Sequence, residues 1–282
     1  MKLIVDNGST KADWCFTDEN GIIQIIQTDG INPIIQSEQC VKNILQSQLY
    51  QQIIKLNIDV QNVSNFFFYG AGCTDSTKDN IASLLRKAIN AEAQIQVESD
   101  LLGAARALCG HEKGIACILG TGSNSCFFNG EQIELHTPSL GYILGDEGSG
   151  AVLGKKFINA IIKGALPHSL CNDFLERNKL TVSDIINNVY KGTAPNRFLA
   201  STSVFIGQNI ANKQLEELVI ENFKDFIQKN IIPYGKEGFP LNAVGSIAYY
   251  YQEQFKKAAN SFGYQIGKIV KSPIYELATY HK

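Results

Sequence analysis

The feature that most constrains this sequence is an opening pattern that occurs twice. Residues 1–40 read as a short buried strand, a glycine turn, a second strand, another turn and a third strand, and residues 114–136 repeat that order. Residues 3–9 and 117–123 share apolar positions followed by glycine and serine, at an offset of 114 residues. A repeat of this length predicts two domains of similar topology and not a solenoid.

The remaining elements follow from apolar spacing and turn residues. Strands are predicted at residues 3–5, 12–17, 22–27, 65–69, 93–97, 114–119, 125–128, 133–136 and 241–244. Helices are predicted at residues 37–54, 76–91, 100–108, 151–162, 170–176, 182–190, 198–211, 215–230 and 248–261. This alternation indicates an α/β fold with mainly parallel sheets, in which each domain opens with an antiparallel meander. We expect the ligand site in a cleft between the two halves.

Composition excludes several classes of protein. The 282 residues carry a net charge of −2, which gives no reason to expect nucleic acid or an anionic membrane as a partner. The first apolar run, residues 3–5, is too short for a signal peptide, and no run approaches a membrane span, so a cytoplasmic location is expected. The seven cysteines are scattered without a Cys-x-x-Cys pair, which favours reduced, buried thiols.

Three glycine turns follow apolar strands, at residues 6–11, 120–124 and 244–248. Each could offer backbone N–H groups to an anion, and glycine permits close approach. The first turn adds the Asp6 carboxylate and Lys11, which suit a metal–phosphate pair. An ordinary hairpin remains the alternative for each turn taken alone. The segment from Gly110 to Gly164 holds glycine at about twice the density of the whole chain, which favours close backbone contact with a ligand.

Two further features carry carboxylates. Asp100 follows the predicted strand 93–97 and stands where a helix should begin. It can act as the N-cap of that helix or as a general base at the carboxyl end of a parallel strand, and both roles are compatible. Asp146 and Glu147 are enclosed by four glycines within residues 141–150. They are expected either to cap the following helix or to bind a polyhydroxy ligand.

These motifs, in this order, resemble the BadF/BadG/BcrA/BcrD ATPase family, and within it the N-acetylglucosamine kinase-like branch. The motifs are Asp-Asn-Gly-Ser-Thr-Lys at residues 6–11, Gly-Thr-Gly-Ser-Asn at 120–124, Gly-Asp-Glu-Gly-Ser at 145–149 and Gly-Ser-Ile-Ala at 245–248. The family belongs to the superfamily of actin, heat-shock ATPases and sugar kinases. The resemblance therefore implies an α/β protein of two ribonuclease-H-like domains, the actin-like ATPase fold, around a central cleft. We expect a first domain at residues 1–110, a larger second domain with a helical insertion at 111–271, and a C-terminal helix at about 272–282 that packs back on the first.

The resemblance also implies a function. It indicates an enzyme that uses ATP and Mg²⁺ to phosphorylate an N-acetylated amino sugar, above all N-acetylglucosamine. Asp100 matches the catalytic base, and Asp6 matches the residue near Mg²⁺. The matching ATP-binding positions are Gly8, Ser9, Thr10, Lys11, Gly120, Thr121, Gly122, Gly245 and Ser246. The matching sugar-binding positions are Asn32, Thr121, Asn124 and Asp146.

Some questions stay open at this point. Residues 138–141 read Pro-Ser-Leu-Gly where relatives often have a Gly-Gly-Trp-Gly-like stretch, which leaves the sugar undecided. The alternative function is an ATPase activator of a radical dehydratase with an iron–sulfur cluster, although Cys109 and Cys126 lack a glycine-flanked ligand arrangement. A non-enzymatic sugar sensor is a third candidate, without a basic DNA-binding stretch to support it. The sequence also leaves open whether the chain forms a homodimer and whether Cys73 touches substrate or only packs.

Overall fold

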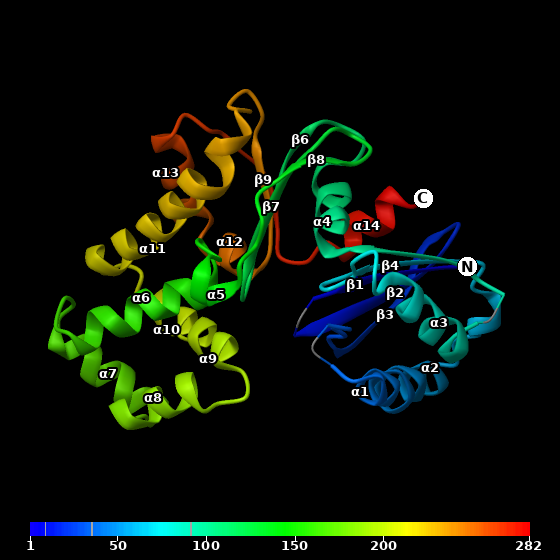
Figure 1. Cartoon of the computed structure of the whole chain (residues 1–282), viewed down its shortest axis with the longest axis horizontal. Helices are drawn as coiled ribbons and strands as arrows, with labels where there is room; N and C mark the ends of the chain where they lie inside the picture. The colour runs from blue at the N-terminus through cyan, green and yellow to red at the C-terminus, as the bar shows by residue number, and fades with distance from the viewer. Residues whose placement is uncertain (9, 35, 91) are drawn as a thin grey trace. The chain divides into compact units, whose positions relative to one another are not determined.

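A computed structural model describes residues 1–8, 10–34, 36–90 and 92–282 of the chain. The chain divides into two compact units (Figure 1). Unit 1 comprises Met1–His111 together with Pro273–Lys282, and unit 2 comprises Glu112–Ser272. Each unit contains one five-stranded mixed sheet with helices packed against it, so the α/β prediction is confirmed.

The sheet of unit 1 combines an antiparallel meander with two parallel strands. Its strands are β1 (Lys2–Asn7), β2 (Lys11–Asp18), β3 (Gly21–Asp29), β4 (Asn65–Gly70) and β5 (Gln94–Ser99), in the order β3-β2-β1-β4-β5. Strands β1 to β3 pair antiparallel, whereas β4 pairs parallel to both β1 and β5. The register aligns Asn7 with Gly70 and Gly70 with Ser99, so the carboxyl ends of β1, β4 and β5 meet at one end of the sheet.

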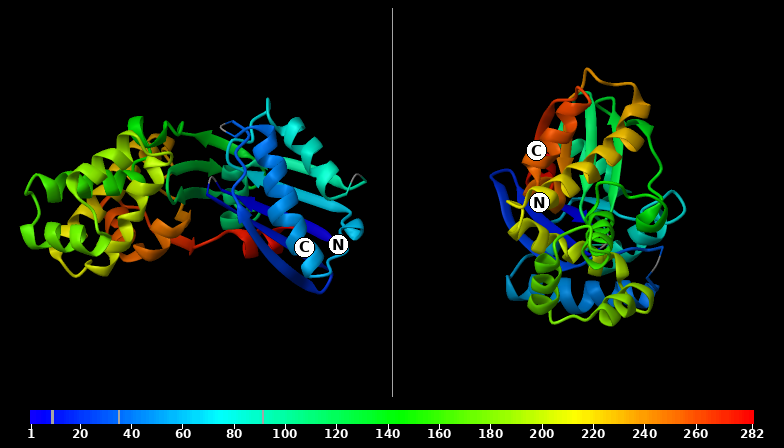
Figure 2. Two further views of the ribbon diagram at one scale, coloured as in Figure 1. Left: turned by 90° about the horizontal axis from the view of Figure 1, so that it is seen from below. Right: turned by 90° about the vertical axis from the view of Figure 1, so that its left-hand side faces the viewer.

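Helices cover both faces of this sheet. The helical segments of unit 1 are α1 (Glu38–Asn43), η1 (Ile44–Leu49), α2 (Tyr50–Lys55), η2 (Val60–Asn62), α3 (Lys78–Ala88), α4 (Asp100–Cys109) and α14 (Ile274–Tyr280). On one face, Trp14, Phe66 and Phe68 pack together in a core that includes buried side chains of α1, η1, α2 and α3. On the other face, Ile4 and Cys15 pack against α4 and α14. The C-terminal helix is therefore part of the core of unit 1, and both chain ends lie in this unit (Figure 2).

The sheet of unit 2 has the same topology. Its strands are β6 (Gly114–Leu119), β7 (Ser123–Phe128), β8 (Ile133–His136), β9 (Leu241–Val244) and β10 (Ile266–Val270), in the order β10-β9-β6-β7-β8. The meander β6–β8 is antiparallel, and β9 pairs parallel to β6 and β10. The repeated opening pattern thus corresponds to a repeated fold.

The alignment of the two turns differs from the one expected from sequence. The last paired residue of the first strand is Asn7 in unit 1 and Leu119 in unit 2. The next residue closes the hairpin in both: Gly8 N–H donates to the Lys11 carbonyl and Gly120 N–H donates to the Gly122 carbonyl. The strand pairing therefore makes Gly120, and not Gly122, the counterpart of Gly8, because the second hairpin loop is one residue shorter.

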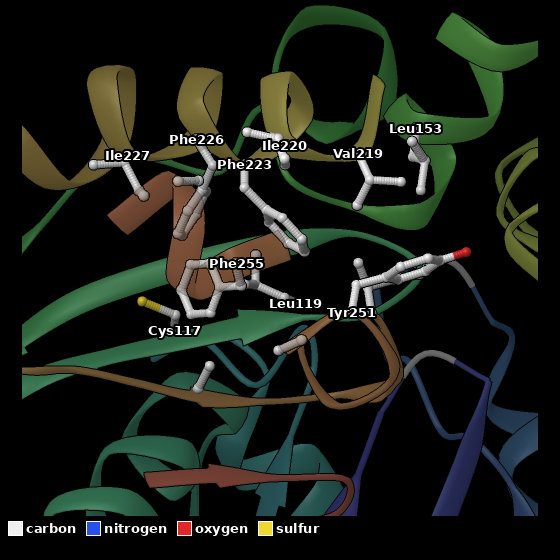
Figure 3. Packing of buried hydrophobic residues seen from close by; sticks show 14 of the residues in the cluster. Cys117, Leu119, Leu153, Val219, Ile220, Phe223, Phe226, Ile227, Tyr251 and Phe255 are labelled. Atoms are coloured by element: carbon white, nitrogen blue, oxygen red, sulfur yellow. The ribbon is translucent and has the colours of Figure 1, made fainter. Parts of the chain in front are cut away.

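Unit 2 carries most of the helices. They are α5 (Gly141–Leu144), α6 (Gly150–Ile162), α7 (His168–Asn178), α8 (Val182–Tyr190), α9 (Pro195–Ser201), α10 (Ser203–Gln208), α11 (Lys213–Phe226), η3 (Ile227–Ile231), η4 (Ile232–Tyr234), α12 (Ser246–Tyr250) and α13 (Gln252–Ser261). Their apolar side chains form one core with the sheet, in which Phe223 of α11 packs against Phe255 of α13 (Figure 3). None of the helices in the described ranges is long and apolar enough to cross a membrane.

Two predicted helices are interrupted and one strand was missed. The predicted helix 198–211 is divided at Thr202, whose buried hydroxyl donates to the Leu199 carbonyl. The predicted helix 248–261 begins earlier and is divided at Tyr251, whose hydroxyl donates to the Ser203 carbonyl. Strand β10 is a sheet edge with exposed Gly267 and Lys268, which hide its apolar alternation. All three features depend on tertiary contacts that periodicity does not report.

The packing of α6 on α9 predicts the effect of a substitution. A Cβ atom added at Gly154 would lie 2.0 Å from the Leu199 carbonyl oxygen, a backbone atom that cannot move without shifting α9. Gly154→Ala is therefore expected to lower stability by about 1–3 kcal/mol through overpacking. Thermal unfolding of the purified variant measures this loss.

Gly238→Ala is the matched control, because an added Cβ atom there meets nothing within 4 Å. Its melting temperature should equal that of the wild type. An unchanged melting temperature for Gly154→Ala would show that α6 and α9 do not pack this closely.

Candidate active site

The first glycine turn is anchored by a buried asparagine. Asn7 is fully buried at the end of β1. Its Nδ2 donates to the Ile31 carbonyl oxygen at 2.6 Å, and its Oδ1 accepts from the Ile31 N–H at 2.7 Å. The turn at Gly8 is thereby tied to the segment that carries Asn32. Thr10 is exposed in the same turn, and Ser9 lies outside the described residues.

Two carboxylates face each other beside this turn. Asp6 on β1 is the register partner of Asp13 on β2, and directly opposed residues of an antiparallel pair project from the same face. Asp13 is buried and accepts from Lys11 Nζ at 2.9 Å and from Gln27 Nε2 at 2.7 Å. Burial, followed by the charges of Asp13 and Asp100, raises the pKa of Asp6 to about 7. A carboxyl group in this environment is expected to attract a cation.

Asp13 was not among the residues predicted from sequence. It is the one charged residue inside a strand whose inner residues are otherwise apolar or threonine. Lys11 and Asp13 are two residues apart in a strand, which places both side chains on the same face. That spacing was the signal in the sequence that could have identified the pair.

Asp100 lies at the start of α4, after β5, but it does not cap the helix. Ser99 is the N-cap, because its Oγ accepts from the Leu102 N–H at 3.2 Å. The N-cap alternative for Asp100 is therefore wrong. Asp100 is the first helical residue, and its Oδ1 accepts from the Leu101 N–H at 2.9 Å. Burial raises the pKa of Asp100, and its charge in turn raises that of Asp6, so the two carboxyl groups belong to one electrostatic cluster.

The loop after β4 packs closely around small residues. A Cβ atom at Gly70 would lie 2.7 Å from Cys73 Sγ, and one at Gly72 would lie 2.6 Å from Asn32 Oδ1. Gly72 has a φ of +77°, which favours glycine. Cys73 is buried in the apolar core, and burial raises the pKa of its thiol to about 12. Cys73 is therefore a packing residue with little thiolate, and Asn32 lies against the same loop.

The second glycine turn is attached to the start of α6. Gly150 N–H donates to the Gly120 carbonyl at 2.8 Å, and Ala151 N–H donates to the Thr121 carbonyl at 3.1 Å. Ser149 caps the helix by accepting from the Val152 N–H. Asp146 and Glu147 thus lie in the loop before the helix and do not cap it, contrary to one of the two expectations from sequence.

The two adjacent acids have different surroundings. Glu147 pairs with Lys229 at 2.9 Å; burial opposes its ionisation, but this contact outweighs burial and lowers its pKa. Asp146 adopts a left-handed backbone with a φ of +53°. Its carboxylate accepts from Ser139 Oγ at 3.1 Å and lies 3.0 Å from where a Cβ atom of Gly122 would be. Burial raises the pKa of Asp146. Glu147 is therefore held by an ion pair with Lys229, whereas Asp146 borders the second turn.

Asn124 lies at the start of β7, two residues after Gly122. Its Oδ1 accepts from the Ser125 N–H at 3.0 Å and lies 3.0 Å from His136 Nε2 on β8. The side chain is partly exposed at the same end of the sheet as the second turn. Thr121, Asn124 and Asp146 therefore come from adjoining segments of unit 2.

The third glycine turn contacts the second. Gly245 has a φ of +121°, and a Cβ atom there would lie 2.3 Å from the Leu119 carbonyl oxygen. Ser246 follows as the exposed first residue of α12. It lines a cavity of about 480 Å³ in unit 2 together with residues of α10, α12 and Tyr251. This volume falls within the range of roughly 300–1,000 Å³ that is typical of small-ligand pockets.

No three His, Cys, Asp or Glu side chains within the described ranges gather closely enough to hold a metal ion by themselves. Asp6 nevertheless offers a carboxylate, the ligand type that Mg²⁺ prefers, whereas both oxygens of Asp13 already accept hydrogen bonds. Mg²⁺ commonly binds through one or two carboxylates together with substrate phosphates and water. Asp6 therefore fits a cation that arrives with a phosphate ligand, with Asp13 beside it.

The comparisons with known proteins agree with these motifs. No family model matches the chain. The chain is 26% identical over 230 residues to the N-acetylmuramic acid/N-acetylglucosamine kinase of Clostridium acetobutylicum, covering 76% of this chain and 74% of that protein. It is 42% identical to the solved structure of a candidate N-acetylglucosamine kinase from Porphyromonas gingivalis, with a TM-score of 0.96, covering 100% of this chain and 98% of the other. The chain belongs to the ATP-dependent sugar kinases of the actin-like ATPase fold.

A more distant structure extends the fold relationship of this sugar kinase. A glucokinase of the ROK family from Streptomyces griseus, solved with glucose and AMPPNP, is 14% identical with a TM-score of 0.59, covering 99% of this chain and 97% of the other. At this identity the likeness concerns the fold alone. It confirms the fold class that the motifs predicted.

Replacing Asp6 by asparagine is expected to stabilise the metal-free sugar kinase above neutral pH. The folded protein keeps the Asp6 proton up to about pH 7, whereas the unfolded chain releases it near the usual pKa of 3.8. Wild-type stability should therefore fall as pH rises from about 4 to about 7. Asp6→Asn lacks this loss, so its melting temperature should exceed that of the wild type at pH 8, by roughly 2–4 °C for each kcal/mol recovered.

The difference between the two proteins should shrink towards pH 5. Asp79→Asn, which removes an exposed carboxylate from the first turn of α3, is the control and should show no such trend. Addition of Mg²⁺ at pH 8 should raise the melting temperature of the wild type more than that of Asp6→Asn. A difference that stays constant between pH 5 and pH 8 would contradict the assignment.

Proposed function

We propose that this sugar kinase transfers the γ-phosphoryl group of ATP to a hydroxyl group of an N-acetylated amino sugar, with N-acetylglucosamine as the first candidate. The observation that carries the proposal is the 42% identity to the candidate N-acetylglucosamine kinase over the full length of this chain. The curated relative named for N-acetylmuramic acid and N-acetylglucosamine supports the same substrate class.

Asp100 is proposed as the general base. It accepts the proton of the sugar hydroxyl as that oxygen attacks the γ-phosphorus, while the bond from phosphorus to the oxygen bridging to the β-phosphate breaks and ADP leaves. The raised pKa of Asp100 supports this role, because a base becomes stronger as its pKa approaches the working pH. The Leu101 N–H fixes one carboxylate oxygen. Because Ser99 caps α4, the Asp100 carboxylate is not needed as the N-cap.

The two glycine turns are proposed to hold the phosphates. Gly8, Thr10 and Lys11 would serve from unit 1, with Ser9 as an expected member, and Gly120, Thr121 and Gly122 from unit 2. Phosphoryl transfer depends mainly on positioning and charge neutralisation, which backbone N–H groups and the Lys11 ammonium can supply. Gly245 and Ser246, beside the cavity of unit 2, would border the adenosine.

Asp6 is the proposed carboxylate for Mg²⁺, with Asp13 beside it. When bound with ATP, Mg²⁺ would neutralise charge on the β- and γ-phosphates. The chain's own contribution is a pair of opposed carboxylates with Lys11 held against one of them. The raised pKa of Asp6 supports this role, because the buried, negatively charged surroundings that disfavour its ionised form would be offset by a bound cation.

Asn32, Thr121, Asn124 and Asp146 are proposed to bind the sugar. Amide and hydroxyl side chains can donate to and accept from sugar hydroxyls, and a carboxylate accepts from two neighbouring hydroxyls. Asp146 is positioned by Ser139 and borders Gly122, which would bring sugar and phosphate contacts together. The alternative of an iron–sulfur ATPase activator has no support from the relatives named above, and Cys126 is fully buried in β7.

The activity is tested with ATP and a panel of sugars. N-acetylglucosamine and N-acetylmuramic acid should be phosphorylated, and glucosamine and glucose should be poorer substrates, with ADP release and sugar phosphate measured together. ATP turnover without sugar phosphate, or equal turnover of all four sugars, would contradict the proposed substrate class.

Asp100→Asn is expected to lower kcat by about 10²–10⁴-fold, because the hydroxyl loses its proton acceptor. Affinity for ADP and the melting temperature should change little, which separates a chemical role from a structural one. Asp79→Asn is the matched control and should keep wild-type kcat. Near-normal turnover of Asp100→Asn would exclude Asp100 as the base.

A further inference from the structure

The cavity of unit 2 lies beside the third glycine turn, between α10 and α12. Its lining consists of Ser203, Val204, Gly207, Gln208, Ser246, Ile247, Tyr250 and Tyr251. None of these residues carries a formal charge at neutral pH. Apolar and aromatic walls with a few hydroxyl and amide groups favour a neutral, flat ligand over a phosphate or a carboxylate.

Tyr251 and Gly207 set one boundary of the cavity. The ring of Tyr251 lies at the margin of the core, and its hydroxyl points away from the labelled phenylalanines (Figure 3). That hydroxyl donates to the Ser203 carbonyl. A Cβ atom at Gly207 would lie 3.3 Å from the Tyr251 hydroxyl, so glycine lets α10 approach this hydroxyl closely. This wall is fixed by the core and by α10.

Tyr250, unlike the buried Tyr251, presents an exposed aromatic ring to the cavity. Tyr250 is 64% exposed although it lines the cavity. Lys271 Nζ donates to its hydroxyl at 2.7 Å and lies 5.0 Å from its ring centroid. Tyr249 packs edge-on against it, with 5.4 Å between ring centroids. Two neighbours therefore orient a ring that is left open to solvent.

The cavity is also connected to the second glycine turn. Gly245 precedes Ser246 and touches the Leu119 carbonyl, one residue before Gly120. Only the third turn separates the cavity from Gly120. One ligand could therefore place a flat ring in the cavity and its phosphates beside Gly120. A nucleotide has this combination of parts, and aromatic side chains commonly stack on bases.

We propose that Tyr250, oriented by Lys271, stacks on the nucleobase and is the residue that makes this sugar kinase prefer a purine nucleotide. The inference rests on the proposed use of ATP and adds to it the residue that recognises the base. A purine offers two fused rings to the Tyr250 ring, whereas a pyrimidine offers one. The preference arises from stacking area and not from a charged contact.

The test measures binding of ADP, CDP and inorganic tripolyphosphate, which carries phosphates without a base. Tyr250→Ala is expected to raise the Kd for ADP about 5- to 30-fold, the effect of losing a base–aromatic stack. It should leave the Kd for tripolyphosphate unchanged and move the ratio of the CDP and ADP constants towards one. Tyr250→Phe keeps the ring and should bind ADP within about twofold of the wild type.

Tyr190→Ala is the matched control, because Tyr190 is an exposed tyrosine of unit 2 that lies outside the cavity lining. It should leave the ADP constant unchanged. Wild-type ADP affinity in Tyr250→Ala would overturn the inference, and so would an equal loss of ADP and tripolyphosphate binding, which signals a general disturbance. The titrations need no sugar. Failure of the wild type to phosphorylate any sugar would therefore count against the proposed function and leave the test of Tyr250 intact.

Discussion

Parallel pairing of β4 with β1, and of β9 with β6, is the interaction on which the candidate site depends. In unit 1 it aligns the carboxyl ends of β1, β4 and β5, so Asp6, the Gly70–Cys73 loop and Asp100 emerge at one end of the sheet. In unit 2 it brings Gly245 against Leu119 and the second turn. Residues that are far apart in the sequence become neighbours because hydrogen bonds fix the register of the strands.

Burial raises the pKa of two carboxyl groups in the candidate site of unit 1, those of Asp6 and Asp100. Asp6, Asp13 and Asp100 are close enough for two of the charges to raise the pKa of the third, and Lys11 offsets part of that repulsion. On a solvent-exposed surface at physiological salt, the repulsion between such charges would be screened over about 10 Å. This crowding costs stability in the free protein, and under the proposed role of Asp6 a bound cation would offset it. If Asp6 has the proposed role, stability and function oppose each other at this end of the sheet.

Much of the architecture could be predicted from the sequence, because meanders, apolar runs and glycine turns are local signals. The fold class and the strand that precedes Asp100 follow from such signals. The sequence could not show whether Ser99 or Asp100 caps α4. Both residue types are good N-caps, and only the backbone geometry decides between them. The division of a helix at Thr202 depends on contacts with other helices, and the contact of Gly122 with Asp146 joins residues from separate loops. Tertiary packing decided the last two of these cases.

The docking of α14 in unit 1 has a consequence for how the protein is made. Unit 1 is assembled from both ends of the chain, whereas unit 2 is one continuous segment between them. During synthesis, all of unit 2 leaves the ribosome before α14, which packs with α4 on Ile4, Cys15 and Tyr69. Unit 2 can therefore complete its core first, while α4 alone covers that apolar face of the unit 1 sheet until residues 273–282 leave the ribosome. For a time the nascent chain therefore contains a complete unit 2 and an incomplete unit 1, the unit that carries Asp100.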